Sequence, residues 1–286
     1  MSPAVARFLL PWTYLVHSRL KARMEQVSWV LINPVVVTAI AAYVTVLSPG
    51  PFIGALALAF IAWQSVYETG YLENDLVTTQ REAAPTLRLA SELHSAATRS
   101  YWILITGKLC VAGLACIGLV ALGGSEPEDG LAVGRFIGLL IASRLAFYAH
   151  NSVRSRLNVV TYLGLAGLKY GTIPALFYTG TEWWAFGAVV VLPFPLLRTL
   201  EHARKDKYHL SIASRLIQDV DRFRPMYYGG LAVVFTVLLA VAGTSLFRLG
   251  LEVAVYLFLL RLVGLALALR MGRRSLTSWG EPRSHS

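Results

Sequence analysis

Charged residues are scarce in this sequence. Charged residues make up only 15% of the 286 residues, whereas hydrophobic residues make up 56%. In soluble domains, charged residues usually make up about a quarter of the sequence. A chain this apolar cannot bury all its apolar side chains in the core of one water-soluble domain, so a cytosolic globular protein is excluded. The composition also excludes a disordered chain and a collagen-like repeat. The composition predicts an integral membrane protein, with membrane lipid as a partner.

Cysteine and acidic residues are also scarce. The only two cysteines, Cys110 and Cys116, lie out of phase within one apolar run, so we expect no disulfide between them. Asp and Glu number 16 against 26 Lys and Arg, which gives a net charge of +10. The basic residues separate apolar runs, as topology signals do, and do not form a nucleic-acid-binding patch. We therefore expect no nucleic-acid partner.

Long apolar runs are what the sequence has in abundance. A run of roughly 17–25 such residues is long enough to cross a bilayer as a helix. About eight runs are present, near residues 28–47, 52–72, 101–123, 131–150, 159–179, 182–198, 226–244 and 248–270. The sequence predicts an all-α fold, a multi-pass transmembrane helical bundle.

The connections between these runs alternate in charge. One set carries Arg and Lys, and the other, such as GGSEPEDG, carries acids and almost no basic residues. The positive-inside rule places both termini and the longer loops on the cytoplasmic side, of the inner or plasma membrane in a bacterium. Because no repeat or soluble linker is present, we expect one membrane domain over 1–286. It has a basic cytoplasmic N-terminal segment over 1–27 and a cytoplasmic tail over 271–286.

A polar cluster follows the second apolar run. Asn74, Thr78 and Glu82 are four residues apart, so on a helix they would share one face. With Asp75 beside them, their amide, hydroxyl and carboxylate oxygens suit Mg²⁺ that is shared with substrate phosphates. Arg81 could contact phosphate oxygens. The alternative is a polar helix end that is simply solvated where it leaves the membrane.

This cluster resembles the first aspartate-rich motif, N-D-x-x-D-x-x-x-D, of the UbiA superfamily of integral-membrane prenyltransferases. Asn74, Asp75 and the acidic Glu82 match it, Thr78 replaces an aspartate, and the following PTLR resembles the family's basic segment. A hydroxyl at this position is also typical of class I terpene synthases, so the motif is most similar to that of UbiA-type terpene cyclases. The resemblance implies a UbiA-like fold and Mg²⁺ as cofactor. It also implies that Asp75 and Arg81 are catalytic and that Asn74, Thr78 and Glu82 bind the metal.

Two later stretches extend the resemblance. YAHNSVRSRLN resembles the family's tyrosine, basic loop and asparagine, and RTLEHARKDKYHL occupies the place of its second motif, D-x-x-x-D. There we expect Glu201 and Asp206 to bind a second metal, because Mg²⁺ prefers oxygen to the ring nitrogen of His202. The expected substrate-binding residues are Tyr67, Tyr71, Tyr148, Arg154, Arg156, Asn158, His202 and Lys205. The alternative for the basic residues is positive-inside anchoring, and for the aromatic residues interfacial packing.

Some charged residues fall inside the apolar runs, namely Lys108, Arg144, Lys169 and Arg261. An unpaired charge in the bilayer costs at least about 2.5 kcal/mol. Each of these residues is therefore a candidate ligand-binding group, or else it extends to the membrane surface or lies near the end of a run.

The favoured function is Mg²⁺-dependent ionisation of an isoprenyl diphosphate in a membrane-embedded cavity. If the allylic cation closes on the substrate's own double bonds, the enzyme is a terpene cyclase. If an aromatic or other lipophilic acceptor captures it, the enzyme is a prenyltransferase. Thr78 and the incomplete second motif favour the cyclase. A transporter or non-enzymatic scaffold is the third possibility, because intramembrane ionisable residues also serve transport. The sequence carries no signal for an oligomeric state.

Overall fold

The computed structural model describes residues 2–81, 87–123, 131–153, 155–205, 208 and 210–270. Within these ranges every regular element is helical and no β-strand occurs. Among the described residues, six helical stretches are long and apolar enough to cross a membrane: Arg23–Val44, Pro49–Gln80, Tyr101–Leu122, Trp183–Ala203, Val220–Ala242 and Ser245–Leu267. The prediction of an all-α, multi-pass helical bundle is confirmed.

Each predicted apolar run forms one long helix or two consecutive helices. The elements are α3 (Arg23–Ile32) with α4 (Pro34–Val44), α5 (Pro49–Leu76), α7 (Tyr101–Leu122), α8 (Val133–Ser152), α9 (Leu157–Phe177), α10 (Trp183–Val191) with α11 (Leu197–Ala203), α13 (Val220–Ala242) and α14 (Ser245–Arg270). Shorter helices are α6 (Ser91–Arg99) and α12 (Ser211–Leu216). The helices α8 and α9 are outside the six apolar stretches, and both carry basic residues, such as Arg144 and Lys169.

The N-terminal segment is folded, which the sequence did not indicate. It forms α1 (Pro3–Ala6), η1 (Arg7–Leu9) and α2 (Thr13–Arg19). Phe8 and Tyr14 are fully buried in a hydrophobic cluster with Leu72 of α5, Ala97 of α6 and Leu104 of α7. The apolar side chains of this segment therefore belong to the core beside α5, and its cytoplasmic location stays a prediction.

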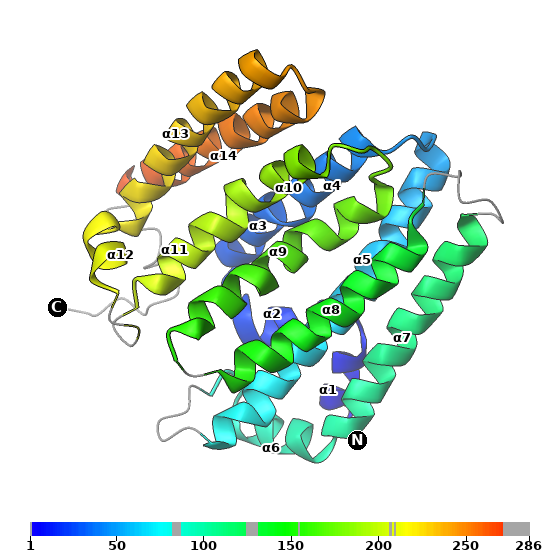
Figure 1. Ribbon diagram of the computed structural model, residues 1–286. Coiled ribbons are helices and arrows are strands. Elements are labelled where there is room, and N and C mark those ends of the chain that lie inside the picture. The colour runs from blue at the N-terminus through cyan, green and yellow to red at the C-terminus, as the bar shows by residue number, and fades with distance from the viewer. Residues whose placement is uncertain are drawn as a thin grey trace. The chain divides into compact units, whose positions relative to one another are not determined.

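The described chain divides into two compact units whose segments interleave along the sequence. Unit 1 comprises Met1–Lys21, Val37–Arg154 and Thr172–Thr179, and unit 2 comprises Ala22–Val36, Ser155–Gly171 and Gly180–Ser286. In unit 1, α5 packs against α7 and α8, and in unit 2, α13 packs along α14 (Figure 1). Neither unit is a continuous stretch of sequence. The organisation as one membrane domain stays a prediction.

Glycine permits close packing of an aromatic ring from a neighbouring helix at Gly70 in unit 1 and at Gly250 in unit 2. A Cβ atom added at Gly70 of α5 would lie 2.2 Å from the ring of Phe147 in α8. A Cβ atom added at Gly250 of α14 would lie 2.6 Å from the ring of Phe235 in α13. No real Cβ atom fits at these distances, so each aromatic ring occupies space that only glycine leaves open.

The helices α10 and α11 are joined by a π-helical turn, η3 (Leu192–Leu196). Pro193 and Pro195 lack the amide hydrogens that a regular α-helix uses, so the helix widens here. The hydroxyl of Tyr227 in α13 donates a hydrogen bond to the carbonyl oxygen of Leu192 at 2.5 Å. This bond satisfies a backbone acceptor that lipid could not satisfy. The turn thereby leads into α11, which carries Glu201 and His202.

Candidate functional site

Asp75 of the predicted first motif is a buried carboxylate surrounded by donors from separate elements. Its exposed fraction is 3%, and it lies one residue before the end of α5. Arg19 of α2 donates two hydrogen bonds to it, at 2.6 Å to Oδ2 and 3.0 Å to Oδ1. Tyr14 donates to Oδ2 at 2.9 Å and the Asn74 amide donates to Oδ1 at 3.0 Å. A bidentate guanidinium–carboxylate pair is among the strongest polar contacts, so Arg19 is held firmly in place.

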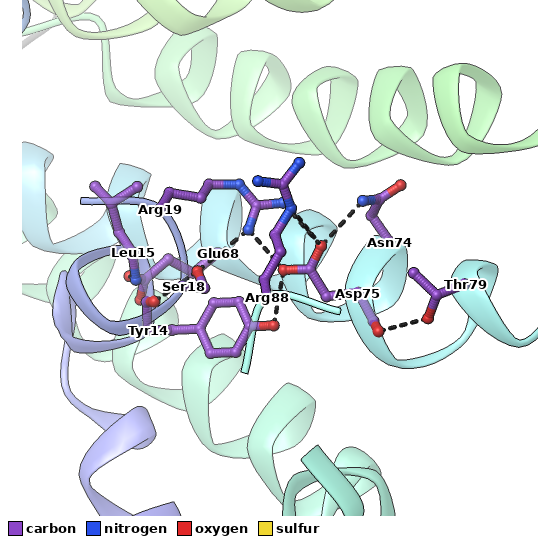
Figure 2. Close-up of polar contacts among 9 residues, drawn as sticks. All are labelled: Tyr14, Leu15, Ser18, Arg19, Glu68, Asn74, Asp75, Thr79 and Arg88. Atoms are coloured by element: carbon purple, nitrogen blue, oxygen red, sulfur yellow. Dashed lines mark hydrogen bonds and ion pairs between the residues drawn. The ribbon is translucent and has the colours of Figure 1, made fainter. Parts of the chain in front are cut away.

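A second guanidinium approaches the same carboxylate. Nε of Arg88 lies 3.4 Å from Oδ1 of Asp75, and its side chain is 40% exposed. Figure 2 shows both arginines turned toward Asp75. Burial disfavours the charge of Arg19, but the hydrogen bond and charge of Asp75 outweigh this and raise the pKa of Arg19. Burial, followed by the charge of Asp75, raises the pKa of Tyr14. Both groups therefore remain protonated donors, and this group of side chains is net positive.

Aromatic side chains form a column on α5 beside this charged group. The rings of Trp63 and Tyr67 stack with centroids 5.0 Å apart, and Tyr67 meets Tyr71 edge-on at 5.2 Å. Phe147 of α8 lies 4.6 Å from Tyr67. The guanidinium carbon of Arg19 lies 3.9 Å from the centroid of Tyr71, a cation–π contact. The structure thus brings together the predicted Tyr67 and Tyr71 next to the charged group.

Glu68 is a residue that sequence reasoning missed. It lies entirely buried on α5, where its Oε2 accepts a hydrogen bond from Nζ of Lys108 in α7 at 2.5 Å. Its Oε1 accepts from the backbone amide of Leu15 at 2.8 Å. Arg144 of α8 forms an ion pair with another acid of α5, with Nη1 2.5 Å from Oε2 of Glu73, but the side chain of Arg144 is 31% exposed. The signal in the sequence was an acid in one apolar run and a base in the next.

The predicted metal-binding stripe assumed a continuous α-helix as far as Glu82, and that assumption is wrong. The α-helix ends at Leu76 and is followed by a 3₁₀ turn, η2 (Thr78–Arg81). The hydroxyl of Thr79 donates to the carbonyl oxygen of Asp75 at 2.6 Å. Such side-chain bonds to the backbone compete with regular helix hydrogen bonds. Glu82 and the side chain of Arg81 lie outside the described residues.

In unit 2, the predicted metal ligand Glu201 is bound by two arginines. Arg224 of α13 donates from Nε to Oε1 at 2.6 Å and from Nη2 to Oε2 at 3.1 Å, and Arg198 donates to Oε2 at 2.9 Å. Nη1 of Arg224 also lies 3.5 Å from Asp221. The sequence marked Arg198 and Arg224 only as topology signals. The second predicted ligand, Asp206, lies outside the described residues.

A further group of polar side chains adjoins Glu201. Nε2 of His202 lies 3.0 Å from Oδ1 of Asn158 and 2.7 Å from the hydroxyl of Tyr208, which is 2.5 Å from Oδ1 of Asn158. The His202 ring stacks on Tyr162 with centroids 4.2 Å apart. The structure thus joins the predicted residues Asn158 and His202, both buried.

Other predicted substrate-binding residues are not brought into these groups. Arg156, Lys205 and Tyr148 are exposed. Arg154 lies outside the described residues.

The described part of the chain does not by itself fit a Mg²⁺ ion. In the ranges that the structure describes, no three His, Cys, Asp or Glu side chains form a metal-ligating group. Asn74 and Thr78 supply only neutral oxygens, and both oxygens of Glu201 accept from arginines. Mg²⁺ is usually bound through one or two carboxylates together with substrate phosphates. A Mg²⁺ site in unit 1 would therefore depend on Glu82 and the substrate, and a second site in unit 2 would depend on Asp206 and the substrate.

Comparison of the chain with protein-family models, curated proteins and solved structures gives no match.

Proposed function

We propose that this chain is a UbiA-type membrane enzyme that ionises an isoprenyl diphosphate and cyclises the resulting cation. One observation carries the proposal: the Arg19 guanidinium lies 3.9 Å above the ring of Tyr71, where the aromatic column meets the arginine–Asp75 group. An isoprenyl diphosphate has the same division, with an anionic head and a long unsaturated tail. The site therefore matches the substrate at both ends.

The arginines would bind the diphosphate head. Arg19 and Arg88 carry planar guanidinium forks, which match phosphate oxygens in pairs. Asp75 accepts two hydrogen bonds from Arg19 and lies 3.4 Å from Arg88, so it positions both cations. Fixed positive charge at the head favours departure of the negatively charged leaving group.

The reaction then proceeds in two steps. The bond between the allylic carbon and the diphosphate oxygen breaks, the electron pair leaves with the oxygen, and the positive charge stays on the carbon chain. The π faces of Tyr67 and Tyr71 would stabilise that cation. Attack by a double bond of the same chain closes a ring, and loss of a proton or addition of water gives a cyclic hydrocarbon or a terpene alcohol.

Mg²⁺ is part of the proposal because of the resemblance, which implies one metal at Asn74, Thr78 and Glu82 and a second at Glu201 and Asp206. When bound, it would supply further charge neutralisation at the diphosphate. The roles of Arg81 in catalysis and of Thr78 in metal binding are part of the same proposal. So is an orientation with both termini in the cytoplasm.

Transport is the second candidate, and the Glu68–Lys108 pair favours it. Paired ionisable residues inside a membrane bundle can mark an ion or proton pathway. However, both carboxylate oxygens of Glu68 are already bonded, one to Lys108 and one to the amide of Leu15. A pair so fully satisfied fits a structural role better than a transport site.

The test is an incubation of the purified full chain in detergent with C10, C15 and C20 isoprenyl diphosphates. Each reaction contains Mg²⁺, with and without EDTA, and no acceptor, and diphosphate release and organic products are measured. A cyclic product that EDTA abolishes supports the cyclase. A prenylated product that forms only after a quinone precursor or phenolic acid is added supports the transferase. No consumption of any diphosphate, with or without acceptor, refutes the enzymatic proposal.

A further inference from the structure

Arg261 is a buried cation inside an apolar helix. It lies on α14, within the membrane-spanning stretch Ser245–Leu267, and only 8% of it is exposed. Among the residues that the structure describes, its Nε has no hydrogen-bond partner. A buried N–H on a charged group is costly when it is left unpaired. This donor therefore calls for an acceptor that the described protein groups do not supply.

The surroundings of Arg261 increase the need for an anion. Its helix, α14, packs along α13, which carries Arg224 and Tyr228. The charges of Arg224 and Arg198 repel the guanidinium of Arg261, whereas Tyr228 and Glu201 favour it. Glu201, however, already accepts hydrogen bonds from both of the other arginines, at 2.6 to 3.1 Å. Arg224 also pairs with Asp221 at 3.5 Å. These five side chains comprise three cations and two anions, so the group as a whole attracts a further negative charge.

Extension to solvent does not account for Arg261. A long basic side chain near a helix end can carry its charge to the aqueous surface, and it is then exposed. Arg248, near the start of the same helix, does this: its side chain is 70% exposed and its Nε lies 3.1 Å from Glu252. Arg261 is instead enclosed, so its charge must be offset where it lies.

We propose that Arg261 and Arg224 form a binding site for a phosphate group, carried either by a phospholipid headgroup or by a soluble phosphate compound. A phosphate offers several acceptor oxygens and up to two charges, so it can meet more than one guanidinium fork at once. This site lies wholly in unit 2. The Arg19–Asp75 group belongs to unit 1, and the phosphate site does not depend on the isoprenyl diphosphate reaction.

The test measures binding to the full chain. In detergent, inorganic pyrophosphate is titrated and its Kd is determined by calorimetry, with every chain in this arm also carrying Arg19→Gln so that the proposed diphosphate site in unit 1 does not contribute. In lipid nanodiscs, the thermal midpoint is compared between phosphatidylcholine alone and phosphatidylcholine mixed with phosphatidic acid. Wild type is compared with Arg261→Gln, with Arg261→Lys, which keeps the charge, and with the control Arg248→Gln on the same helix. Because Arg261→Gln removes a buried unpaired charge, we expect this variant to fold.

The outcomes separate the sources of the phosphate. Pyrophosphate binding that weakens at least ~10-fold in Arg261→Gln, and less in Arg261→Lys, supports a soluble phosphate ligand. A rise in the thermal midpoint with phosphatidic acid that is lost in Arg261→Gln and kept in Arg248→Gln supports a lipid headgroup. If neither probe acts on wild type, or if Arg261→Gln responds as Arg248→Gln does, the site is refuted.

Discussion

Nζ of Lys108 lies 2.5 Å from Oε2 of Glu68, and both side chains are entirely buried. Lys108 is on α7 and Glu68 is on α5, and the other carboxylate oxygen accepts from the amide of Leu15 in α2. One carboxylate therefore fixes the relative position of three helices in unit 1. The two charges are tolerated in an apolar bundle because each satisfies the other.

Removal of one member of this pair should destabilise the protein severely. Glu68→Gln or Lys108→Met leaves the partner buried without its counter-charge, at a cost of about 3–5 kcal/mol. We expect each single variant to lower the free energy of unfolding by that amount, measured by denaturant unfolding in detergent. The double variant should cost less than the sum of the two. The exposed pair Arg248–Glu252 provides the control: Arg248→Gln should change stability by at most about 1 kcal/mol. Equal effects of Lys108→Met and Arg248→Gln would contradict this role.

Substitution of Gly70 should test the packing of α5 on α8. Gly70→Ala places a methyl group where the Phe147 ring lies 2.2 Å away, so the helices must shift. We expect a loss of about 1–3 kcal/mol in the free energy of unfolding, as for other overpacked cores. Gly113→Ala in α7 is the matched control, because nothing lies within 4 Å of its added Cβ. The double variant Gly70→Ala/Phe147→Leu replaces the ring by a smaller side chain, so it should recover part of the lost free energy of unfolding.

The spans could be predicted from the sequence because the apolar composition of a run is a local property. The polar contacts between residues far apart in the sequence could not be predicted. Tyr14 and Arg19 reach Asp75 across 61 and 56 residues, and Lys108 reaches Glu68 across 40. No periodicity in one chain shows which of several basic residues meets a given acid. The packing of the N-terminal segment could not be predicted for the same reason, because its Tyr14 and Arg19 contact an aspartate of α5 that is distant in the sequence.

The site could be located but its geometry could not. The N-D dipeptide marked Asn74 and Asp75, and both lie in the described polar group. The end of the α-helix at Leu76 could not be predicted, because no glycine or proline marks it in the sequence. It coincides instead with a hydrogen bond from the hydroxyl of Thr79 to the carbonyl oxygen of Asp75. Similarly, the Glu201 motif gave no sign of Arg224, which lies 23 residues away.

If Arg19 binds the diphosphate head, its charge and its fork geometry should contribute separately. Arg19→Gln removes both, and we expect kcat/KM for the isoprenyl diphosphate to fall about 100-fold, equivalent to about 2.7 kcal/mol. Arg19→Lys keeps the charge but loses the bidentate fork, so we expect an intermediate loss of roughly 10-fold. The exposed Arg23→Gln, four residues on, should retain wild-type kinetics.

Folding must be checked separately for these variants. Asp75 keeps Tyr14, Asn74 and Arg88 as partners when Arg19 is lost, so far-UV circular dichroism should remain helical. A folded Arg19→Gln enzyme with unchanged kcat/KM would show that Arg19 only stabilises the structure.

Substitutions of Thr78 should distinguish two roles of its hydroxyl, binding a metal ion or stabilising the turn. It is buried and begins the 3₁₀ turn η2. If its hydroxyl binds Mg²⁺, Thr78→Ala should raise the Mg²⁺ concentration for half-maximal turnover at least ~10-fold, as loss of a group at a metal site commonly does. Thr78→Ser keeps the oxygen and should behave as wild type. If the hydroxyl only caps the turn, Thr78→Ala should lose about 1 kcal/mol of stability and leave the Mg²⁺ dependence unchanged. A parallel assay without acceptor links this residue to the reaction: wild type and Thr78→Ser should both release a cyclic product, and a product that requires an added acceptor in both would favour the prenyltransferase.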